Sequence, residues 1–200
     1  MISFLSKKIT YFLIHTSNIS PDSDQIEVYI YGLECFLNTG FTICILFIWG
    51  LFTNTIPETI CWIIAFSVLR HHVGGLHAHT QLSCILSSCL LGISNWIVIE
   101  YIPYQSTIAL LVCAICIVTF MLYAPLDTPK YKLTHSMEKK EKLYSILIIL
   151  IELLICFALK NKLSVSILYS DMCVYILFVI KKLITSPFIN TKPELFTVVS

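Results

Sequence analysis

The residues best suited to chemistry lie in one short passage, from Arg70 to Cys84. It reads Arg-His-His-Val-Gly-Gly-Leu-His-Ala-His-Thr-Gln-Leu-Ser-Cys, and so brings four of the chain's six histidines close to one cysteine. The double glycine lies between two apolar segments, where it interrupts the helix and lets the backbone turn sharply. A thiol beside a histidine base is an arrangement typical of nucleophilic catalysis. We therefore predict that Cys84 is a nucleophile and His77 its base.

The spacing of these two residues constrains the local structure. A helix that starts near Thr80 places Cys84 about one turn inside, near the positive end of the helix dipole, where the thiol pKa falls. On one continuous helix, His77 and Cys84 would lie roughly 10 Å apart along the axis, whereas a hydrogen bond needs about 3 Å. His77 must therefore lie in a turn made possible by Gly74 and Gly75 and fold back, or serve the thiol of a second subunit.

The residues from Arg70 to Cys84 also have interpretations other than nucleophilic catalysis. A cysteine at a helix start often only packs, and Arg70 can mark the edge of the membrane or hold a substrate carboxylate. Imidazole and thiolate also suit zinc, but no HExxH motif is present and no acidic residue lies between Arg70 and Cys84 to act as a base. We therefore predict no metal and no cofactor. The remaining histidines are expected at the membrane interface: His71, His72 and His79.

The rest of the chain is that of a membrane protein. Of its 200 residues, 57% are hydrophobic and only 12% are charged, about half the charged fraction of a soluble domain. Several nearly uncharged segments reach the roughly 17–25 residues that cross a bilayer as a helix. The segments are 33–52, 59–69, 82–99, 104–124, 143–159 and 164–180. We predict an all-α polytopic integral membrane protein forming a single domain over 1–200, with four to six transmembrane helices among six hydrophobic segments.

One segment is too short for a simple assignment. Residues 59–69 span a bilayer only by including their polar flanks; otherwise they form a re-entrant or interfacial piece. Before the first span, residues 1–30 form an amphipathic segment and a linker, with Lys7 and Lys8 inside the amphipathic part. Such a segment lies on the lipid surface and is not a cleaved signal peptide. The net charge of +1 gives no reason to expect nucleic acid as a partner.

The positive charges predict the orientation. With six crossings and a cytoplasmic N-terminus, only Lys160 and Lys162 fall outside. The remaining basic residues then fall inside: Lys7, Lys8, Arg70, Lys130, Lys132, Lys139, Lys140, Lys142, Lys181, Lys182 and Lys192. This strong bias places both termini, the 70–79 turn and a basic loop over 125–142 in the cytoplasm.

Acidic residues at membrane depth support a competing function. Glu34, Glu152 and Asp171 lie within apolar segments, where ionisable groups are costly and face a partner or a cavity. Glu34 could orient His77, but all three would equally suit a small membrane transporter or peptide exporter. A third alternative is a structural or signalling protein whose cysteines only pack. Packing is expected for all cysteines except Cys84, including the Cys113-x-x-Cys116 pair within a span.

Further residues complete a pattern around the candidate site. They are Tyr31-Gly32-Leu33-Glu34, Leu69-Arg70, Gly74-Gly75, His77-Ala78, Cys84, and Tyr123-Ala124-Pro125 with Thr128 and the lysines that come after it. In these residues, over most of its length, the chain resembles the accessory gene regulator B family, the membrane endopeptidases of Gram-positive quorum sensing. In the family's basic loop lysines often come soon after Tyr-Ala-Pro, whereas here Leu126 and Asp127 intervene before Lys130.

The resemblance implies a defined reaction in the bacterial cell membrane. The family's enzymes remove the acidic C-terminal tail of a short precursor peptide and promote its cyclisation to a thiolactone or lactone signal. By this resemblance, Cys84 forms a thioester with the precursor and His77 transfers the proton. Arg70, Gly74, Gly75 and Glu34 are expected to support the site, and Lys130 and Lys132 to hold the substrate. The expected partners are this peptide, membrane lipid and a second copy in a homodimer.

Overall fold

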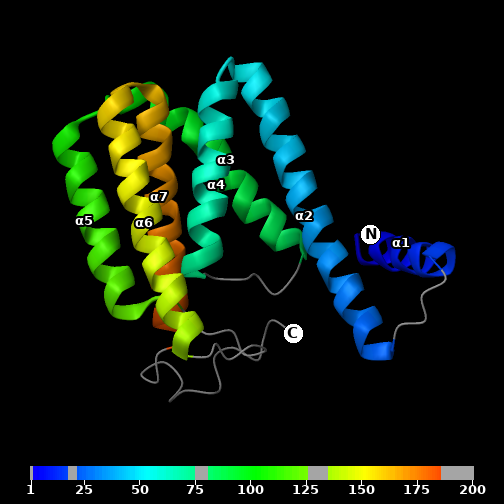
Figure 1. Cartoon of the computed structure of the whole chain (residues 1–200). Coiled ribbons are helices and arrows are strands. Elements are labelled where there is room, and N and C mark those ends of the chain that lie inside the picture. The colour runs from blue at the N-terminus through cyan, green and yellow to red at the C-terminus, as the bar shows by residue number, and fades with distance from the viewer. Residues whose placement is uncertain (1, 18–21, 75–80, 126–134, 186–200) are drawn as a thin grey trace, which may run out of the picture.

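The computed structural model describes residues 2–17, 22–74, 81–125 and 135–185, and these form seven helices (Figure 1). The helices are α1 (Ile2–Ser17), α2 (Ser23–Thr53), α3 (Ile56–Val73), α4 (Gln81–Tyr101), α5 (Ser106–Tyr123), α6 (His135–Leu159) and α7 (Lys162–Thr185). The part of the chain that the structure describes contains no strand. The all-α fold predicted from composition is therefore confirmed, and each of the six apolar segments is a helix.

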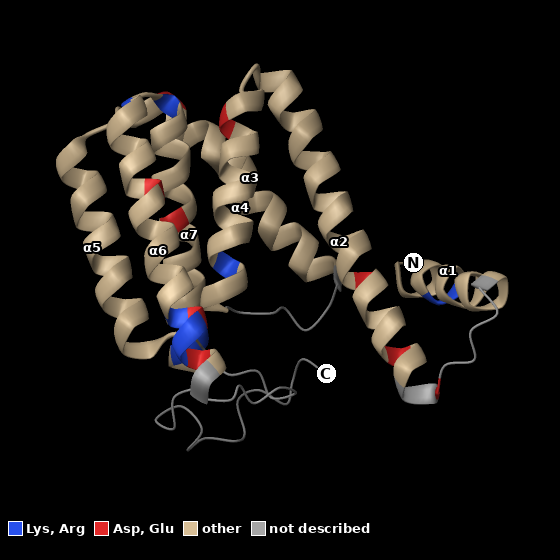
Figure 2. Ribbon diagram, viewed as in Figure 1, with Lys and Arg blue, Asp and Glu red and all other residues tan. Residues whose placement is uncertain are grey.

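Helices α2 to α7 run back and forth, so that their ends gather at two opposite ends of a bundle (Figure 1). We call one of them the Arg70 end: α3, α5 and α7 finish there, and α4 and α6 begin there. The opposite end, which we call the Lys162 end, carries the start of α7. Figure 2 shows basic residues at both ends, with those of α3, α6 and the end of α7 at the Arg70 end. The end of α3 and the basic start of α6 thus lie on the same side.

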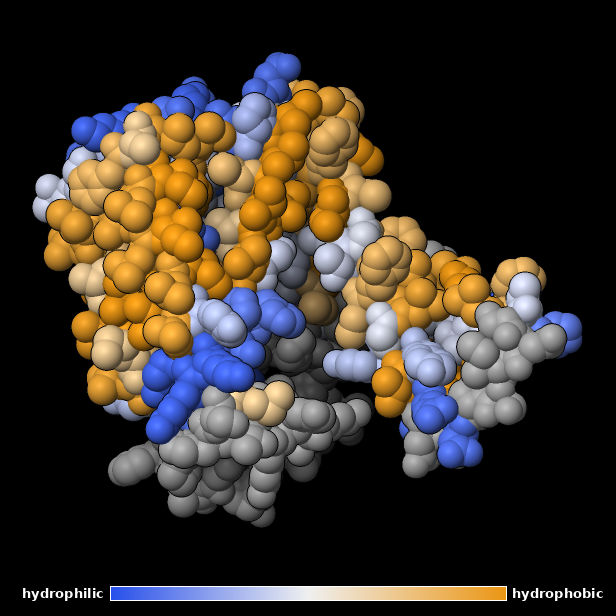
Figure 3. Space-filling view, in the orientation of Figure 1, coloured by the Kyte–Doolittle hydropathy of each residue, from blue (hydrophilic) through white to orange (hydrophobic). Residues whose placement is uncertain are grey.

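The surface of this bundle is suited to lipid. Five helices are long and apolar enough to cross a membrane: α2, α4, α5, α6 and α7. Large apolar side chains such as Phe52, Leu90 and Leu154 are exposed on their outer faces, and Figure 3 shows hydrophobic residues covering most of the visible side of the bundle. In water such a surface would aggregate, whereas in a bilayer it is solvated by acyl chains. The protein is a polytopic membrane protein.

The short apolar segment at 59–69 lies within helix α3. It is a single helix that extends from Ile56 to Val73 by including its polar flanks, and its 18 residues correspond to ~27 Å. Its most extensive contacts are with α7, and Trp62, Leu69 and Val73 are buried in the core. One face of α3 is therefore buried in the bundle, while Ile60, Ile64 and Val68 are exposed on the other.

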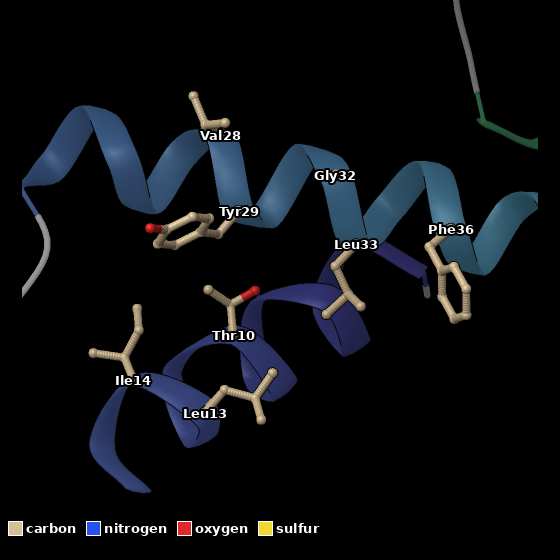
Figure 4. A pocket seen from close by; sticks show the side chains of 8 residues that line it. All are labelled: Thr10, Leu13, Ile14, Val28, Tyr29, Gly32, Leu33 and Phe36. Atoms are coloured by element: carbon tan, nitrogen blue, oxygen red, sulfur yellow. The ribbon is translucent and has the colours of Figure 1, made fainter. Parts of the chain in front are cut away.

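Helix α1 lies beside the bundle, against the N-terminal half of α2 (Figure 1). Ser6 and Thr10 are buried against α2, whereas Lys7 and Lys8 are exposed. Between the two helices lies an open, apolar pocket of about 540 Å³ (Figure 4). Its lining residues are Thr10, Leu13, Ile14, Val28, Tyr29, Gly32, Leu33 and Phe36. The location of α1 on the lipid surface stays a prediction.

The basic segment expected as a loop over 125–142 is helical from His135 onward, where α6 begins. Met, Glu and Lys are good helix formers, and Glu138 precedes Lys142 by four residues, a favourable spacing on a helix face. The lysines of this stretch therefore project from the first turns of a membrane helix. At the same end, the Lys182 ammonium lies over the Tyr123 ring, which joins the ends of α7 and α5.

Candidate active site

The candidate site begins where α3 ends. Gly74 terminates the helix with φ of 75° and ψ of −178°, while its N–H donates to the Arg70 carbonyl at 3.0 Å. A side chain with a Cβ is strained at this positive φ, so glycine is the residue that the turn requires. The preceding residue, Val73, is fully buried. The chain therefore leaves α3 in a direction set by a fixed helix and one permissive residue.

Cys84 lies in the first turn of α4, which begins at Gln81. It is half-buried, whereas most cysteines of the bundle core are fully buried: Cys89, Cys113, Cys116, Cys156 and Cys173. The N-terminal turn of a helix carries unpaired N–H groups and the positive end of the dipole, both of which stabilise a thiolate. This position agrees with the helix start predicted near Thr80, and the residue is partly exposed.

Two residues from other helices lie within electrostatic range of Cys84. One is Arg70, whose guanidinium also lies over the Phe66 ring, 5.4 Å from its centroid. Burial lowers the pKa of Arg70, and the negative charge of a Cys84 thiolate opposes this shift by raising it. The other is Tyr31 on α2, which also interacts with the Cys35 side chain. Arginine stays charged throughout the physiological range, so it can stabilise a thiolate at Cys84.

Glu34 is directed elsewhere. Its Oε1 accepts a hydrogen bond from Ser6 of α1 at 3.3 Å, and Ser6 is fully buried between the two helices. Glu34 therefore ties α1 to α2, while its charge also acts on Tyr31. The described contacts connect it to the site only through this tyrosine.

A polar pair at the end of α3 was not predicted from the sequence. Nδ1 of His72 donates a hydrogen bond to Oε2 of Glu141 on α6 at 2.6 Å. The His72 ring also packs against Tyr144 of the same helix, with the ring centroids 5.4 Å apart, and against His71. The side chains of His72 and Glu141 are 23% and 31% exposed, so the pair is only partly screened by solvent. His72 was expected to be only an interfacial polar residue, whereas it joins the site to α6.

The remaining predicted site residues lie outside the described residues: Gly75, His77, Lys130 and Lys132. The roles of His77 as base and of the two lysines as substrate contacts therefore stay predictions. Among the described residues, no group of three or more His, Cys, Asp or Glu side chains is arranged to hold a metal ion. The groups that the structure brings together are thus a thiol, a guanidinium, a phenol and a nearby histidine–carboxylate pair.

A second set of ionisable groups lies halfway along α6 and α7 (Figure 2). Asp171 is fully buried, Glu152 is 7% exposed, and their carboxyl groups interact with one another. The neighbouring side chains include Cys113 and Cys116 of α5, which are buried as predicted. Glu152 and Asp171 are therefore neighbours in space, as acids at membrane depth usually are, but they lie far from the end of α3.

Comparison with known proteins gives a consistent result. The family model described as accessory gene regulator B matches residues 6–185. The accessory gene regulator protein B of Staphylococcus carnosus (strain TM300) is 28% identical over 131 residues, covering 65% of this chain and 68% of that protein. An AgrB-like protein of Listeria monocytogenes serotype 4a (strain HCC23) is 26% identical over 159 residues, covering 77% and 78%. No solved structure matches the chain.

Proposed function

The chain belongs to the accessory gene regulator B family, and we propose that it is a membrane cysteine endopeptidase acting on a short signal-peptide precursor. The observation that carries this proposal is the position of Cys84, half-buried in the first turn of α4 and within electrostatic range of Arg70. Both features favour a thiolate, and the same end of the bundle carries the lysine-rich start of α6. A thiolate beside basic residues suits a peptide with an acidic tail.

The proposed reaction has two steps. In the first, the Cys84 thiolate attacks the scissile carbonyl, the peptide C–N bond breaks, and His77 gives the proton it took from the thiol to the departing amine. The N-terminal part of the precursor is then held on Cys84 as a thioester, and the C-terminal tail leaves.

In the second step, a thiol or hydroxyl of the precursor attacks the thioester carbonyl. A thiolactone or lactone ring forms, the bond to sulfur breaks, and Cys84 regains its proton. An attacking group on the same chain has a high effective concentration, so it competes well with water. A site at the edge of an apolar bundle also limits hydrolysis.

The proposed orientation places the Arg70 end in the cytoplasm of a bacterial cell. The lysines at the start of α6, together with Arg70, Lys181 and Lys182, lie at this end, while Lys160 and Lys162 lie at the other. Positive residues near membrane helices favour the cytoplasmic side. In this orientation, a precursor made in the cytoplasm meets Cys84 directly.

Substitution of the nucleophile tests the proposal. Cys84→Ala should abolish cleavage of the precursor in liposomes without lowering membrane insertion, because one half-buried thiol contributes little to an apolar bundle. Cys89→Ala, on the same helix but buried, is the matched control and should cleave normally. Processing by the Cys84 variant at the wild-type rate would disprove the proposed function.

A second candidate function is transport of a peptide or small solute. The observation that favours it is the buried pair formed by Glu152 and Asp171 in the bundle core. Intramembrane acids commonly mark ion or substrate pathways. A transporter would need the two carboxyl groups, whereas the proposed peptidase would not. Substituting them therefore distinguishes the two functions.

A further inference from the structure

The end of α3 is held by two kinds of contact. On one side, Leu69 and Val73 are fully buried in the core. On the other, His72 reaches across to α6 and forms its 2.6 Å contact with Glu141. Glu141 belongs to the basic first turns of α6, and the partners are 69 residues apart in the chain. The pair therefore joins the end of α3, just before the candidate catalytic turn, to the start of α6.

The location of this pair matters because His72 lies just before the helix break. Two residues later, Gly74 ends α3 with a positive φ, and the chain then continues to Cys84 on α4. Glycine can adopt many backbone conformations. A side-chain contact near Gly74 therefore helps to fix the direction in which the chain leaves α3. A hydrogen bond to a charged group is among the stronger ones, and here it acts immediately before the glycine.

We propose that His72 and Glu141 form a positioning pair, which holds the chain leaving α3 against α6 and so presents the catalytic turn to Cys84. The proposal rests on the function proposed above and adds two residues that neither transfer a proton to substrate nor bind it. Within the described part of the chain, the titratable side chains whose rings pack against His72 are His71 on α3 and Tyr144 on α6. Those that act on Cys84 are Arg70 and Tyr31.

The first test is kinetic and uses the full-length protein in liposomes. His72→Ala and Glu141→Ala should each lower kcat by about tenfold with little change in KM, since a small misplacement of reacting groups costs this much or more. The double variant should be no slower than either single variant, because both remove the same contact. Glu141→Gln keeps a hydrogen-bond acceptor and should restore most of the activity.

The matched control is the ion pair at the opposite end of the bundle. Lys162 Nζ lies 2.8 Å from Glu100 Oε2, and both side chains are about half exposed. Glu100→Ala removes a contact of the same kind far from the site and should leave kcat unchanged. If Glu100→Ala and Glu141→Ala have equal effects, or if well-folded His72→Ala protein has normal kcat, the positioning role is wrong.

A second measurement needs no precursor. The rate at which iodoacetamide alkylates Cys84, measured by mass spectrometry of the peptide that contains it, reports how well the thiol is activated, because the thiolate is the reactive form. At neutral pH, His72→Ala should slow this reaction by about tenfold, and the difference should disappear at high pH where the thiol ionises unaided. An unchanged rate in the variants disproves the positioning role. Slowed alkylation in a protein that cleaves no precursor would disprove the proposed function alone.

Discussion

The two groups of ionisable side chains in this bundle differ in their surroundings. At the Arg70 end, Cys84 lies in a helix terminus with Arg70 in range, and His72 has a carboxylate partner. Halfway along the bundle, Glu152 and Asp171 have mainly each other and an apolar core. A carboxylate that loses water without a strong partner is destabilised, and in the central pair the contact between the two acids is the main compensation. A thiol at a helix terminus can ionise and exchange protons with solvent.

Under the proposed function, peptide chemistry takes place at the Arg70 end of the bundle, and the central acids take no part in it. The buried pair has no described nucleophile or cation beside it other than core cysteines, whereas the Arg70 end has a half-buried thiol and a guanidinium. Burial alone therefore does not identify the site. The useful signal is an accessible nucleophile surrounded by groups that stabilise its charged form.

After Cys84→Ala, which removes the nucleophile, the largest effect among the variants of these two regions is expected for His77→Ala. If His77 is the base, cleavage should fall by about 10²–10⁴-fold and should partly recover at high pH, where the Cys84 thiol ionises unaided. The pH–rate profile of the purified enzyme in liposomes measures this. If a chelator inactivates the wild-type enzyme and zinc restores it, the Arg70 end contains a metal site, and catalysis by Cys84 and His77 without a metal ion is wrong.

A smaller effect is expected from the basic segment. Changing Lys130 and Lys132 to Glu should raise KM several-fold and leave kcat nearly unchanged, which is the result of lost uniform binding. Because exposed charges are screened over about 8 Å at physiological salt, added salt should raise KM in the wild type more than in the variant. Kinetics in nanodiscs at low and high salt measure both quantities. An unchanged KM, with topology verified, would leave these lysines as orientation signals.

The smallest effect is expected at the central pair. Glu152→Gln and Asp171→Asn replace buried carboxyl groups by neutral amides of similar size, so the bundle should assemble and cleavage should change by less than about twofold, or about 0.4 kcal/mol. Precursor cleavage and thermal stability of both variants measure this. Abolished cleavage in a stably folded variant would show that the two regions are coupled and would favour the transport function.

The sequence was sufficient to predict the helices, since long apolar runs have few alternatives in a membrane. Their limits were harder to predict. Helix α2 begins at Ser23 and not near residue 33, and α6 begins at His135 within the expected loop. The extension of α2 mixes polar and apolar residues and packs against α1, whereas that of α6 is rich in charged residues that are good helix formers. Neither extension is a continuous apolar run, so hydropathy alone did not predict it.

At the site, the sequence predicted what is local and missed what is distant. The helix break at Gly74 and the position of Cys84 in the first turn of α4 depend on neighbouring residues and are confirmed. The contact of His72 with Glu141 joins residues 69 apart, and no periodicity links them. Glu34 was considered as a group that could orient His77, which lies outside the described residues, and its hydrogen bond to Ser6 was not predicted. Such pairings depend on how the helices pack.

The central position of α3 has a consequence for the synthesis of the protein. This helix carries Glu58 and Arg70 and, among the described helices of the bundle, is the one that is not apolar enough to count among the five candidate spans. Charged residues make insertion of an isolated helix less favourable, so α3 depends on packing against its neighbours. Its main partner, α7, is the last of the described helices to leave the ribosome. The helix that leads into the candidate catalytic turn is therefore secured in the bilayer only after α7 has been made, which delays assembly of a reactive thiol until the whole bundle is present.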